Sequence, residues 1–258
     1  MICCIIQART GSKRLPKKVI QKIDNNLTIL DYVINQVKYS KKIEKIVIAT
    51  TDLMEDDVIC QHLDLRKIKY FRGSSEDVLD RFYQCAKKES AENIVRITAD
   101  NPLIDPNIID KTIEVYENKE FDLVTNTINR TFPYGTEVEV FSFDSLEKSW
   151  NNAKKPSERE HVTPFIRNPE NKFLLTNIKN EEDFSFLRYT IDRTEDLKLV
   201  KEIIKNISTR PILLKDIITL YKNNSKIFDI NKNIKHDGYL SSKEKDEQYF
   251  KSKNNERT

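Results

Sequence analysis

Short apolar runs and longer amphipathic stretches alternate along the first half of the chain. Residues 1–8, MICCIIQA, form a continuous apolar run that ends in a polar loop, and residues 27–40 place apolar side chains at helical spacing. The same alternation continues to residue 127. It predicts strands at 1–8, 45–50, 69–73, 93–100 and 121–127, and helices at 27–40, 55–63, 75–90 and 106–119.

This order of elements predicts an α/β fold. Alternating strands and helices are typical of βαβ units, which build a mostly parallel sheet with helices on both faces and a site at the C-terminal edge of the strands. Two helix starts are supported by their residues. Ser74 or Ser75 is expected to cap the helix at 75–90, and Pro106 is expected in the first turn of the helix at 106–119.

The rhythm changes after residue 127. Residues 136–143 (TEVEVFSF) alternate as in a half-buried strand, residues 142–153 have helical spacing, and residues 173–178 again suggest a strand. We expect a segment of about 128–183 to form a layer inserted over the sheet. Residues 184–192 (FSFLRYTID) are then predicted to be the last strand of the main domain, followed by a helix.

A chain of 258 residues is long enough for one domain with an extension. The main domain is predicted at 1–207, closing with a helix at 194–207. Residues 208–258 are predicted to form a C-terminal helix after Pro211 and a polar tail rich in Lys, Glu, Asn and Ser.

Charge and cysteine content exclude several classes of function. The 44 basic and 41 acidic residues give a net charge of +3, which provides no global field for coating a nucleic acid. The four cysteines form no CxxC pair and are predicted to be reduced core residues. The first apolar run is too short for a membrane span and lacks the basic start of a signal peptide. We therefore expect a cytoplasmic protein with neither nucleic acid nor membrane as its partner.

The loop after the first strand is strongly basic. Gly11 and Ser12 are surrounded by five cationic side chains, namely Arg9, Lys13, Arg14, Lys17 and Lys18. A loop between a parallel strand and a helix offers backbone N–H groups to an anion, and Gly11 permits close approach, so the loop is interpreted as a phosphate cradle. It matches neither the Walker nor the dinucleotide-binding glycine pattern. The alternative is a solvated basic turn.

Two aspartates end apolar stretches far apart in the sequence. Asp100 ends the strand at 93–100, and Asp192 ends the stretch at 184–192. Mg²⁺ prefers a few carboxylates combined with phosphate oxygens and water, so these two residues are predicted to hold one ion. The alternative is that each aspartate caps the following helix. Asp105 and Glu195 are predicted to be such caps.

Six segments resemble a known family in the same order: QARTGSKRLPKKV, FRGSSEDVLDRF, VRITADNPLIDP, EVEVFSF, SEREHVTPF and LRYTIDRTEDL. Over about residues 2–205 the chain resembles the bacterial cytidylyltransferases of the spore-coat polysaccharide biosynthesis protein F group. It is more distantly similar to the CMP-sialic acid and CMP-3-deoxy-manno-octulosonate synthetases. The resemblance implies a Rossmann-like nucleotidyltransferase fold of the GT-A-like type. It also implies transfer of CMP from CTP to an acidic sugar or related acceptor, in the synthesis of surface polysaccharide or glycoconjugate precursors.

The resemblance assigns residues to the nucleotide half of the site. It implies that nucleotide is bound by Ala8, Arg9, Gly11, Ser12, Asp77, Asp80 and Arg81. It implies catalytic roles for Arg14, Lys18, Asp100 and Asp192, with Mg²⁺ as cofactor on the two aspartates. Asp77 has an alternative reading as a helix N-terminal acid in an i, i+4 pair with Arg81. Where the family usually has a glycine this chain has Lys17, which leaves open whether Lys17 or Lys18 contacts phosphate.

The middle segment supplies the candidates for acceptor binding, which are Arg130, Tyr134, Glu137, Glu139, Arg159 and His161. These residues either bind the acceptor or hold the inserted layer together. His161 is a candidate general base because imidazole titrates near neutrality. A homodimer is expected through residues 130–165, by the resemblance and because the alternating strand there needs its second face covered.

The predicted reaction is in-line attack by an acceptor oxygen on the α-phosphorus of CTP, with pyrophosphate as leaving group. Mg²⁺ and the basic loop would stabilise the charge that develops on the phosphoryl oxygens. Two alternatives belong to other classes. A nucleotide-sugar-dependent glycosyltransferase would share the fold and the acidic metal site but lack the basic loop. A non-catalytic nucleotide-binding protein would lose a metal carboxylate or the loop arginines.

Overall fold

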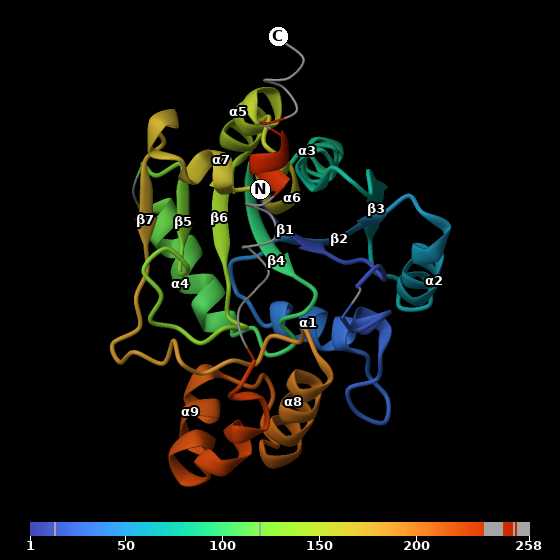
Figure 1. Ribbon diagram of the computed structural model, residues 1–258, viewed down its shortest axis with the longest axis vertical. Helices are drawn as coiled ribbons and strands as arrows, with labels where there is room; N and C mark the ends of the chain where they lie inside the picture. Colours follow the sequence, from blue (N-terminus) through green and yellow to red (C-terminus); the bar gives the residue numbers. More distant parts are fainter. Residues whose placement is uncertain (13, 119, 235–244, 250, 252–258) are drawn as a thin grey trace.

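A central seven-stranded sheet organises the computed structural model (Figure 1). The structure describes residues 1–12, 14–118, 120–234, 245–249 and 251. Lys13 and most of the predicted polar tail lie outside them. In sequence order the strands are β1 (Ile2–Gln7), β2 (Lys45–Thr51), β3 (Tyr70–Gly73), β4 (Asn93–Thr98), β5 (Leu123–Thr125), β6 (Glu139–Ser142) and β7 (Leu175–Asn177).

The strand order is β3-β2-β1-β4-β6-β5-β7, and β6 is the strand that runs antiparallel to its neighbours β4 and β5. Because β1 pairs with both β2 and β4, the loops after β1 and β4 leave the sheet side by side at the point where the strand order reverses. Ligands of open α/β sheets bind in the crevice at such a point. The predicted α/β fold is confirmed.

Helices cover both faces of the sheet (Figure 1). They are α1 (Ile29–Val37), α2 (Asp57–Asp64), α3 (Val78–Glu89), α4 (Pro106–Glu117), α5 (Phe143–Asn152), α6 (Pro156–His161), α7 (Pro164–Arg167), α8 (Thr194–Asn206) and α9 (Leu214–Asn223), with 3-10 turns η1 (Lys18–Ile20), η2 (Met54–Asp56), η3 (Pro169–Asn171) and η4 (Ser225–Asn231). None of the helices in the described ranges has the length and apolar character needed to cross a membrane.

Alternate side chains of the central strands enter two separate cores. Cys4 and Ile6 of β1 pack with α1, α2 and α4, whereas Cys3 and Ile5 pack with α3, α5 and α7. Both cysteines of β1 are fully buried, and burial raises the pKa of the Cys3 thiol to about 12. All four cysteines are buried and free, which confirms them as reduced core residues.

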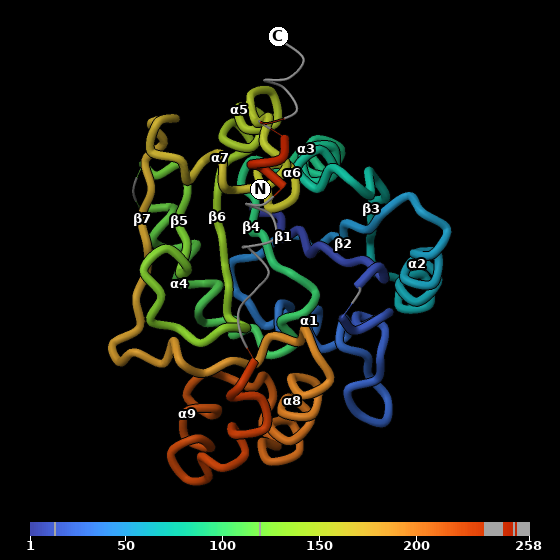
Figure 2. The backbone as a smooth tube through the Cα atoms, in the orientation of Figure 1, coloured from blue at the N-terminus to red at the C-terminus, as the bar shows by residue number. Residues whose placement is uncertain are grey.

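A third core lies at one end of the molecule. There α8, α9 and η4 pack together and against residues of the segment 184–191 (Figure 2). Residues 208–234 are therefore packed onto α8 rather than extended from it. The boundary at residue 207 remains a prediction.

The segment after residue 127 is placed differently from the prediction. Its strands do not form a layer over the sheet but extend it, because β6 pairs with β4 and β7 pairs with β5. Val140 and Phe141 of β6 are fully buried in opposite cores, so this strand needs cover on both faces. The helices α5, α6 and α7 of the same segment pack on the face that carries α3.

Residues 184–192 do not form the predicted last strand. They run along the loops of the sheet and make one isolated bridge, from Arg188 to Tyr134. Tyr189 N donates to Tyr134 O and Ile191 N donates to Asp100 O, both at 2.8 Å. The apolar side chains of this stretch are instead buried in the third core, which explains the strand-like pattern.

Of three predicted helix caps, one is confirmed and two are wrong. Asp77, rather than Ser74 or Ser75, caps α3, because its side chain accepts from Asp80 N. Asp105 caps α4 as predicted. Glu195 is not a cap: it lies inside the first turn of α8, and Asp196 accepts the backbone N–H groups of Asp192 and Arg193 at 2.9 Å.

Candidate active site

The loop between β1 and η1, residues 8–18, is held in a tight shape by its own backbone. Thr10 anchors it, because Thr10 N and Oγ1 both donate to Asp56 Oδ1 at 2.7 Å. The N–H groups of Ser12 and Lys17 both donate to Thr10 O. Lys17 has a φ of 54°, in the left-handed region that favours glycine.

The exposed side of this loop carries the predicted nucleotide residues. Arg9, Gly11 and Arg14 are exposed, while Ala8 is buried at the end of β1. A Cβ added to Gly11 would meet Glu55 Oε1 at 3.0 Å, so the loop passes close to η2 at that point. The loop thus combines a fixed backbone with cations directed outward.

Lys18 joins the two predicted metal aspartates. Its Nζ donates to Asp100 Oδ2 at 2.9 Å, to Asp192 Oδ1 at 3.1 Å and to Ile191 O at 2.9 Å. The structure therefore brings together two carboxylates that lie 92 positions apart in the sequence (192 minus 100). Both are partly exposed, at 25% and 21% of their side-chain surface.

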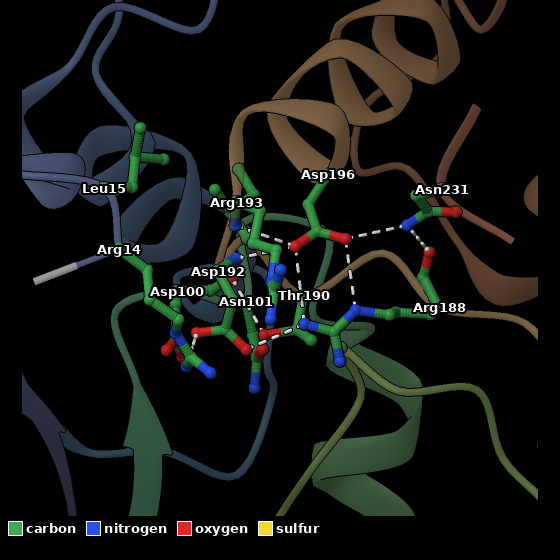
Figure 3. A network of polar contacts seen from close by, with 12 residues as sticks. Arg14, Leu15, Asp100, Asn101, Arg188, Thr190, Asp192, Arg193, Asp196 and Asn231 are labelled. Carbon is green, nitrogen blue, oxygen red and sulfur yellow. Dashed lines mark hydrogen bonds and ion pairs between the residues drawn. The ribbon is translucent and has the colours of Figure 1, made fainter. Parts of the chain in front are cut away.

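Asp192 is surrounded by further cations (Figure 3). Arg188 donates to its Oδ2 at 2.7 Å, and Arg14 lies 3.0 Å from its Oδ1. Burial alone would raise the pKa of Asp192, but the charge of Lys18 and the hydrogen bond from Arg188 hold that pKa at about 2. The carboxylate is therefore ionised at neutral pH.

Asp196 fixes the turn that carries Asp192 (Figure 3). It is completely buried and accepts hydrogen bonds from Arg188 Nε at 3.1 Å and from Asn231 Nδ2 at 2.8 Å, in addition to the two backbone bonds described above. Sequence reasoning missed Arg188 and Asp196. Their signal was present in LRYTIDRTEDL, where four more charged residues surround the chosen aspartate.

The donor set suits a magnesium ion that arrives with its nucleotide. Asp100 Oδ2 and Asp192 Oδ1 already converge on one cationic atom, Lys18 Nζ. In the part of the chain that the structure describes, no group of three or more His, Cys, Asp or Glu side chains is placed to hold a metal. Mg²⁺ is commonly bound by one or two carboxylates, with substrate phosphates and water as the other ligands. The two aspartates fit that pattern.

Arg81 lies buried behind the nucleotide loop. It is 1% exposed, its NH1 donates to Ser74 O at 2.6 Å, and its Nε has no partner among the described residues. Burial, together with the nearby charge of Arg9, lowers the pKa of Arg81 to about 10. The guanidinium of Arg81 therefore lies inside the protein and close enough to Arg9 to feel its charge.

Three other predicted site residues, Asp77, Asp80 and Arg159, make contacts between helices. Asp77 lies at the N-terminus of α3, as its alternative reading proposed, but its ion-pair partner is Arg159, whose Nε donates to Asp77 Oδ2 at 2.8 Å, and not Arg81. Asp80 accepts from Trp150 Nε1 at 2.7 Å and is thereby turned toward α5. These contacts fasten α5 and α6 to α3 and leave Asp80 and Arg159 away from the loop cations.

A polar cavity of about 700 Å³ opens next to the carboxylates. The predicted acceptor residues other than Arg159 line it, together with residues that sequence reasoning did not select. Its walls are Arg96, Thr98, Thr127, Arg130, Tyr134, Glu137, Glu139, Lys155, Ser157, Glu158, His161, Thr163, Pro164, Arg167, Asn168 and Asp246. Thr98 Oγ1 donates to Asp100 Oδ1, which ties this cavity to the carboxylate cluster.

Glu139, in the cavity wall, is a buried carboxylate that pairs with two arginines. It forms ion pairs with Arg96 and Arg167 and accepts from Thr163 Oγ1 at 2.7 Å. Burial would raise its pKa, but Arg167 and Arg96 lower it to about 2. Arg96 also donates to Gln7 Oε1 at 2.9 and 3.1 Å, so the network reaches the end of β1. Sequence reasoning missed Arg96, although a charge inside the apolar strand NIVRIT was a usable signal.

Glu137 connects the other side of the cavity to Asn101, which follows Asp100 in the chain. It accepts from Arg130 NH1 at 2.7 Å, from Asn101 Nδ2 at 2.9 Å and from Gly135 N at 2.9 Å. The guanidinium of Arg130 stacks on the Tyr134 ring, 3.9 Å from its centroid. Gly135 has a φ of 112°, and a Cβ there would meet Tyr189 Cδ2 at 2.6 Å, so this turn accepts only glycine.

His161 lines the same cavity from the end of α6. Burial, together with the charge of Arg96, lowers its pKa below the ordinary 6.5. The imidazole is therefore neutral at pH 7 and able to accept a proton.

Exposed loop cations, two neighbouring carboxylates and a polar cavity lie together at the C-terminal ends of the paired strands β1 and β4, where ligands of α/β sheets bind. A family model described as cytidylyltransferase matches residues 3–234. The chain therefore belongs to the cytidylyltransferase family and is an enzyme of that class. The resemblance noted from the six sequence segments is confirmed.

Similar proteins agree with this assignment. The spore coat polysaccharide biosynthesis protein SpsF of Bacillus subtilis is 34% identical over 86% of this chain and 95% of its own length. An uncharacterized protein of Methanocaldococcus jannaschii is 40% identical over 93% of this chain and 98% of its own. The solved structure of a cytidylyltransferase from Leptospira borgpetersenii superimposes with a TM-score of 0.85, at 34% identity over 91% of this chain and 99% of that one.

Proposed function

We propose that this enzyme transfers CMP from CTP to an acidic sugar or related acceptor and releases pyrophosphate. The observation that carries the proposal is the convergence of Asp100 and Asp192 on one cation, Lys18, beside a polar cavity whose wall residue Thr98 donates to Asp100. A glycosyltransferase or a non-catalytic binding protein is less well supported, because the basic loop and both carboxylates occur together in a chain of this family.

The triphosphate is assigned to the first loop. Arg9, Gly11, Ser12 and Arg14 offer outward cations and backbone groups for it, and Lys18 is the loop lysine that reaches the carboxylates. We therefore assign phosphate contact to Lys18 rather than to Lys17. Mg²⁺ held by Asp100 and Asp192 would neutralise charge on the phosphoryl oxygens.

The chemistry is a single displacement at phosphorus. An acceptor oxygen forms a bond to the α-phosphorus of CTP, the bond from that phosphorus to the α,β-bridging oxygen breaks, and pyrophosphate leaves with the electron pair. His161, which is neutral in its cavity, takes the proton of the acceptor hydroxyl. The cations of the loop hold the leaving group.

The acidic character of the acceptor is supported by two arginines of the cavity. Arg130 and Arg167 each bind a wall carboxylate through one nitrogen, and Arg167 Nε has no partner among the described residues. A more distant relative also supports an acidic sugar as acceptor. It is the 3-deoxy-manno-octulosonate cytidylyltransferase of Rickettsia canadensis, which is 30% identical over 49% of this chain and 52% of its own length. We place the product among precursors of surface polysaccharides or glycoconjugates, made in the cytoplasm.

The test is pyrophosphate release with each of the four nucleoside triphosphates against a panel of acidic sugars, sugar phosphates and phosphonates. We expect release with CTP, dependent on Mg²⁺ and on an acceptor. Equal turnover with UTP or GTP would contradict the preference for CTP, and release without any acceptor would contradict the transfer.

A homodimer through residues 130–165 remains part of the proposal, but one argument for it is wrong. Both faces of β6 are covered within the chain, so this strand does not need a second subunit. Sedimentation at micromolar concentration is the test, and a monomeric mass would refute the dimer.

A further inference from the structure

A short segment near the C-terminus packs against α6. This C-terminal segment, residues 245–249 and 251, is helical and lies beside α6 in Figure 1, where it is red. Asp246 Oδ1 accepts from Ser157 N at 2.8 Å, and Asp246 Oδ2 accepts from Ser157 Oγ at 2.5 Å. Lys245 Nζ lies 2.9 Å from Glu160 Oε2. Two successive side chains thus fasten the segment to one helix.

These contacts lie at the acceptor cavity. Asp246 and Ser157 both line it, and so do Lys155, Glu158 and His161, which belong to α6 or its N-cap. The C-terminal segment is therefore one wall of the space assigned to the acceptor, and it adds a carboxylate to that wall.

The segment lies beyond the part of the chain that defines the family. The cytidylyltransferase model ends at residue 234, and it includes the first loop, both aspartates and all other cavity residues. Asp246 is thus the cavity residue outside that match. Among the described residues it contacts the acceptor side and not the nucleotide side.

We propose that the C-terminal segment determines acceptor specificity in this enzyme, with Asp246 binding a hydroxyl or ammonium group of the acceptor at the end remote from the attacked phosphorus. The inference rests on the proposed function. A carboxylate has about four acceptor positions, and Ser157 uses two of them. The remaining positions can accept from a substrate donor, while the negative charge repels an anionic substituent at this end.

The first experiment tests whether the C-terminal segment packs on α6, and it does not depend on enzyme activity. Hydrogen exchange is measured on the full chain for the peptide that covers α6, in the wild type, in Asp246→Ala and in Glu247→Ala. Glu247 is exposed on the same segment, so its variant removes an equal charge and serves as the matched control. We expect faster exchange of the α6 peptide in Asp246→Ala and unchanged exchange in Glu247→Ala. Equal exchange in all three proteins would overturn the inference.

The second experiment tests selection of the acceptor. The acceptors used are those with which the wild type releases pyrophosphate from CTP. For each, the KM of the acceptor is compared with the KM of analogues that lack one hydroxyl or amine, in the wild type and in each variant. Asp246→Ala should raise the acceptor KM about tenfold and leave the KM for CTP unchanged. In this variant, the analogue that lacks the bound group should have the same KM as the complete acceptor. Glu247→Ala should behave as the wild type.

The two experiments separate this inference from the proposed function. Absence of pyrophosphate release by the wild type with every acceptor would contradict the proposed function. Turnover in which Asp246→Ala and the wild type rank all acceptors alike, with the same KM values, would contradict the role of Asp246 alone.

Discussion

The carboxylate cluster and the acceptor cavity both cancel their charges with ion pairs, but at different depths. Asp100 and Asp192 are 25% and 21% exposed and pair with Lys18 at the edge of the sheet. Glu139 is 4% exposed and lies between Arg96 and Arg167 inside the wall of the cavity. Both carboxylates of the first set are accessible to a ligand, whereas in the second set the carboxylate is buried behind two arginines that line the cavity.

This difference predicts different consequences of mutation. Partly exposed pairs contribute little to folding and can exchange one partner for a ligand. Buried pairs contribute strongly once formed, because removing one partner leaves the other charge uncompensated. Substitutions in the carboxylate cluster should therefore lower the rate more than the stability, and substitutions at Glu139 should do the reverse.

The largest effect is expected for Glu139→Gln. The variant leaves Arg96 and Arg167 without their shared carboxylate, so the free energy of unfolding should fall by about 3–5 kcal/mol. Urea denaturation at pH 7 measures it, with Glu120→Gln at an exposed position as control. A loss below about 1 kcal/mol, the range of exposed pairs, would place Glu139 in the same class as the carboxylate cluster.

The next largest effect is expected for Asp100→Asn, and it concerns the rate of the reaction rather than the stability of the fold. Asn keeps the shape and removes one negative charge from the metal position, so turnover should fall about a hundredfold or more, which corresponds to roughly 3 kcal/mol in the barrier. Pyrophosphate release at saturating Mg²⁺ measures it, and the thermal midpoint should change little. Asp192→Asn should lose as much rate with a lower midpoint, since Asp192 also pairs with Arg188.

Near-wild-type rates in both variants would defeat the metal assignment. They would leave the two aspartates as structural residues, for which Asn is a close substitute.

The meeting of the first loop with Asp100 was predictable from sequence for a physical reason. Their charges stand at the ends of apolar strands, and parallel strands bring their C-terminal ends to one edge, so Asp100 could be placed beside the first loop. Asp192 lies at that edge as predicted, but the strand predicted at 184–192 is not formed. Its stretch reaches the site through the backbone contact of Ile191 with Asp100 and not through a strand ladder.

The acceptor half was harder to predict because its key contacts join distant elements. Arg96 sits within β4, and its partner Glu139 is opposite it on β6, a register that the sequence does not specify. Arg167 is the last residue of α7 and pairs with the same carboxylate. Asp246 reaches the cavity from outside the family match. Periodicity identifies which side chains are buried, but not which buried charges meet.

The pH dependence of stability sharpens the comparison further. The pKa of Glu139 is about 2 in the folded state and 4.5 ordinarily, so the unfolded state binds more protons between these values. The stability that the ionised carboxylate contributes is present above pH 4.5 and is lost as the pH falls toward 2. Between pH 4.5 and 3.5 the wild type should lose about 1 kcal/mol more than Glu139→Gln. Parallel curves from urea unfolding would contradict this.

The smallest effect concerns Lys17 in the first loop. Its left-handed backbone strains any residue with a Cβ, so Lys17→Gly should raise the free energy of unfolding by about 0.5–1 kcal/mol. Lys17→Ala removes the same charge and keeps the Cβ, and it should show no gain. If both variants changed stability equally, the charge rather than the backbone would be responsible.

The most direct test of the proposed reaction follows the α-phosphorus of CTP. With CTP labelled at that atom and an acceptor from the panel, we predict that the label appears in the acceptor product and that a γ-label appears in pyrophosphate. Both should form about a hundredfold more slowly in Asp100→Asn. Label recovered in free CMP or CDP, with none on the acceptor, would contradict the account.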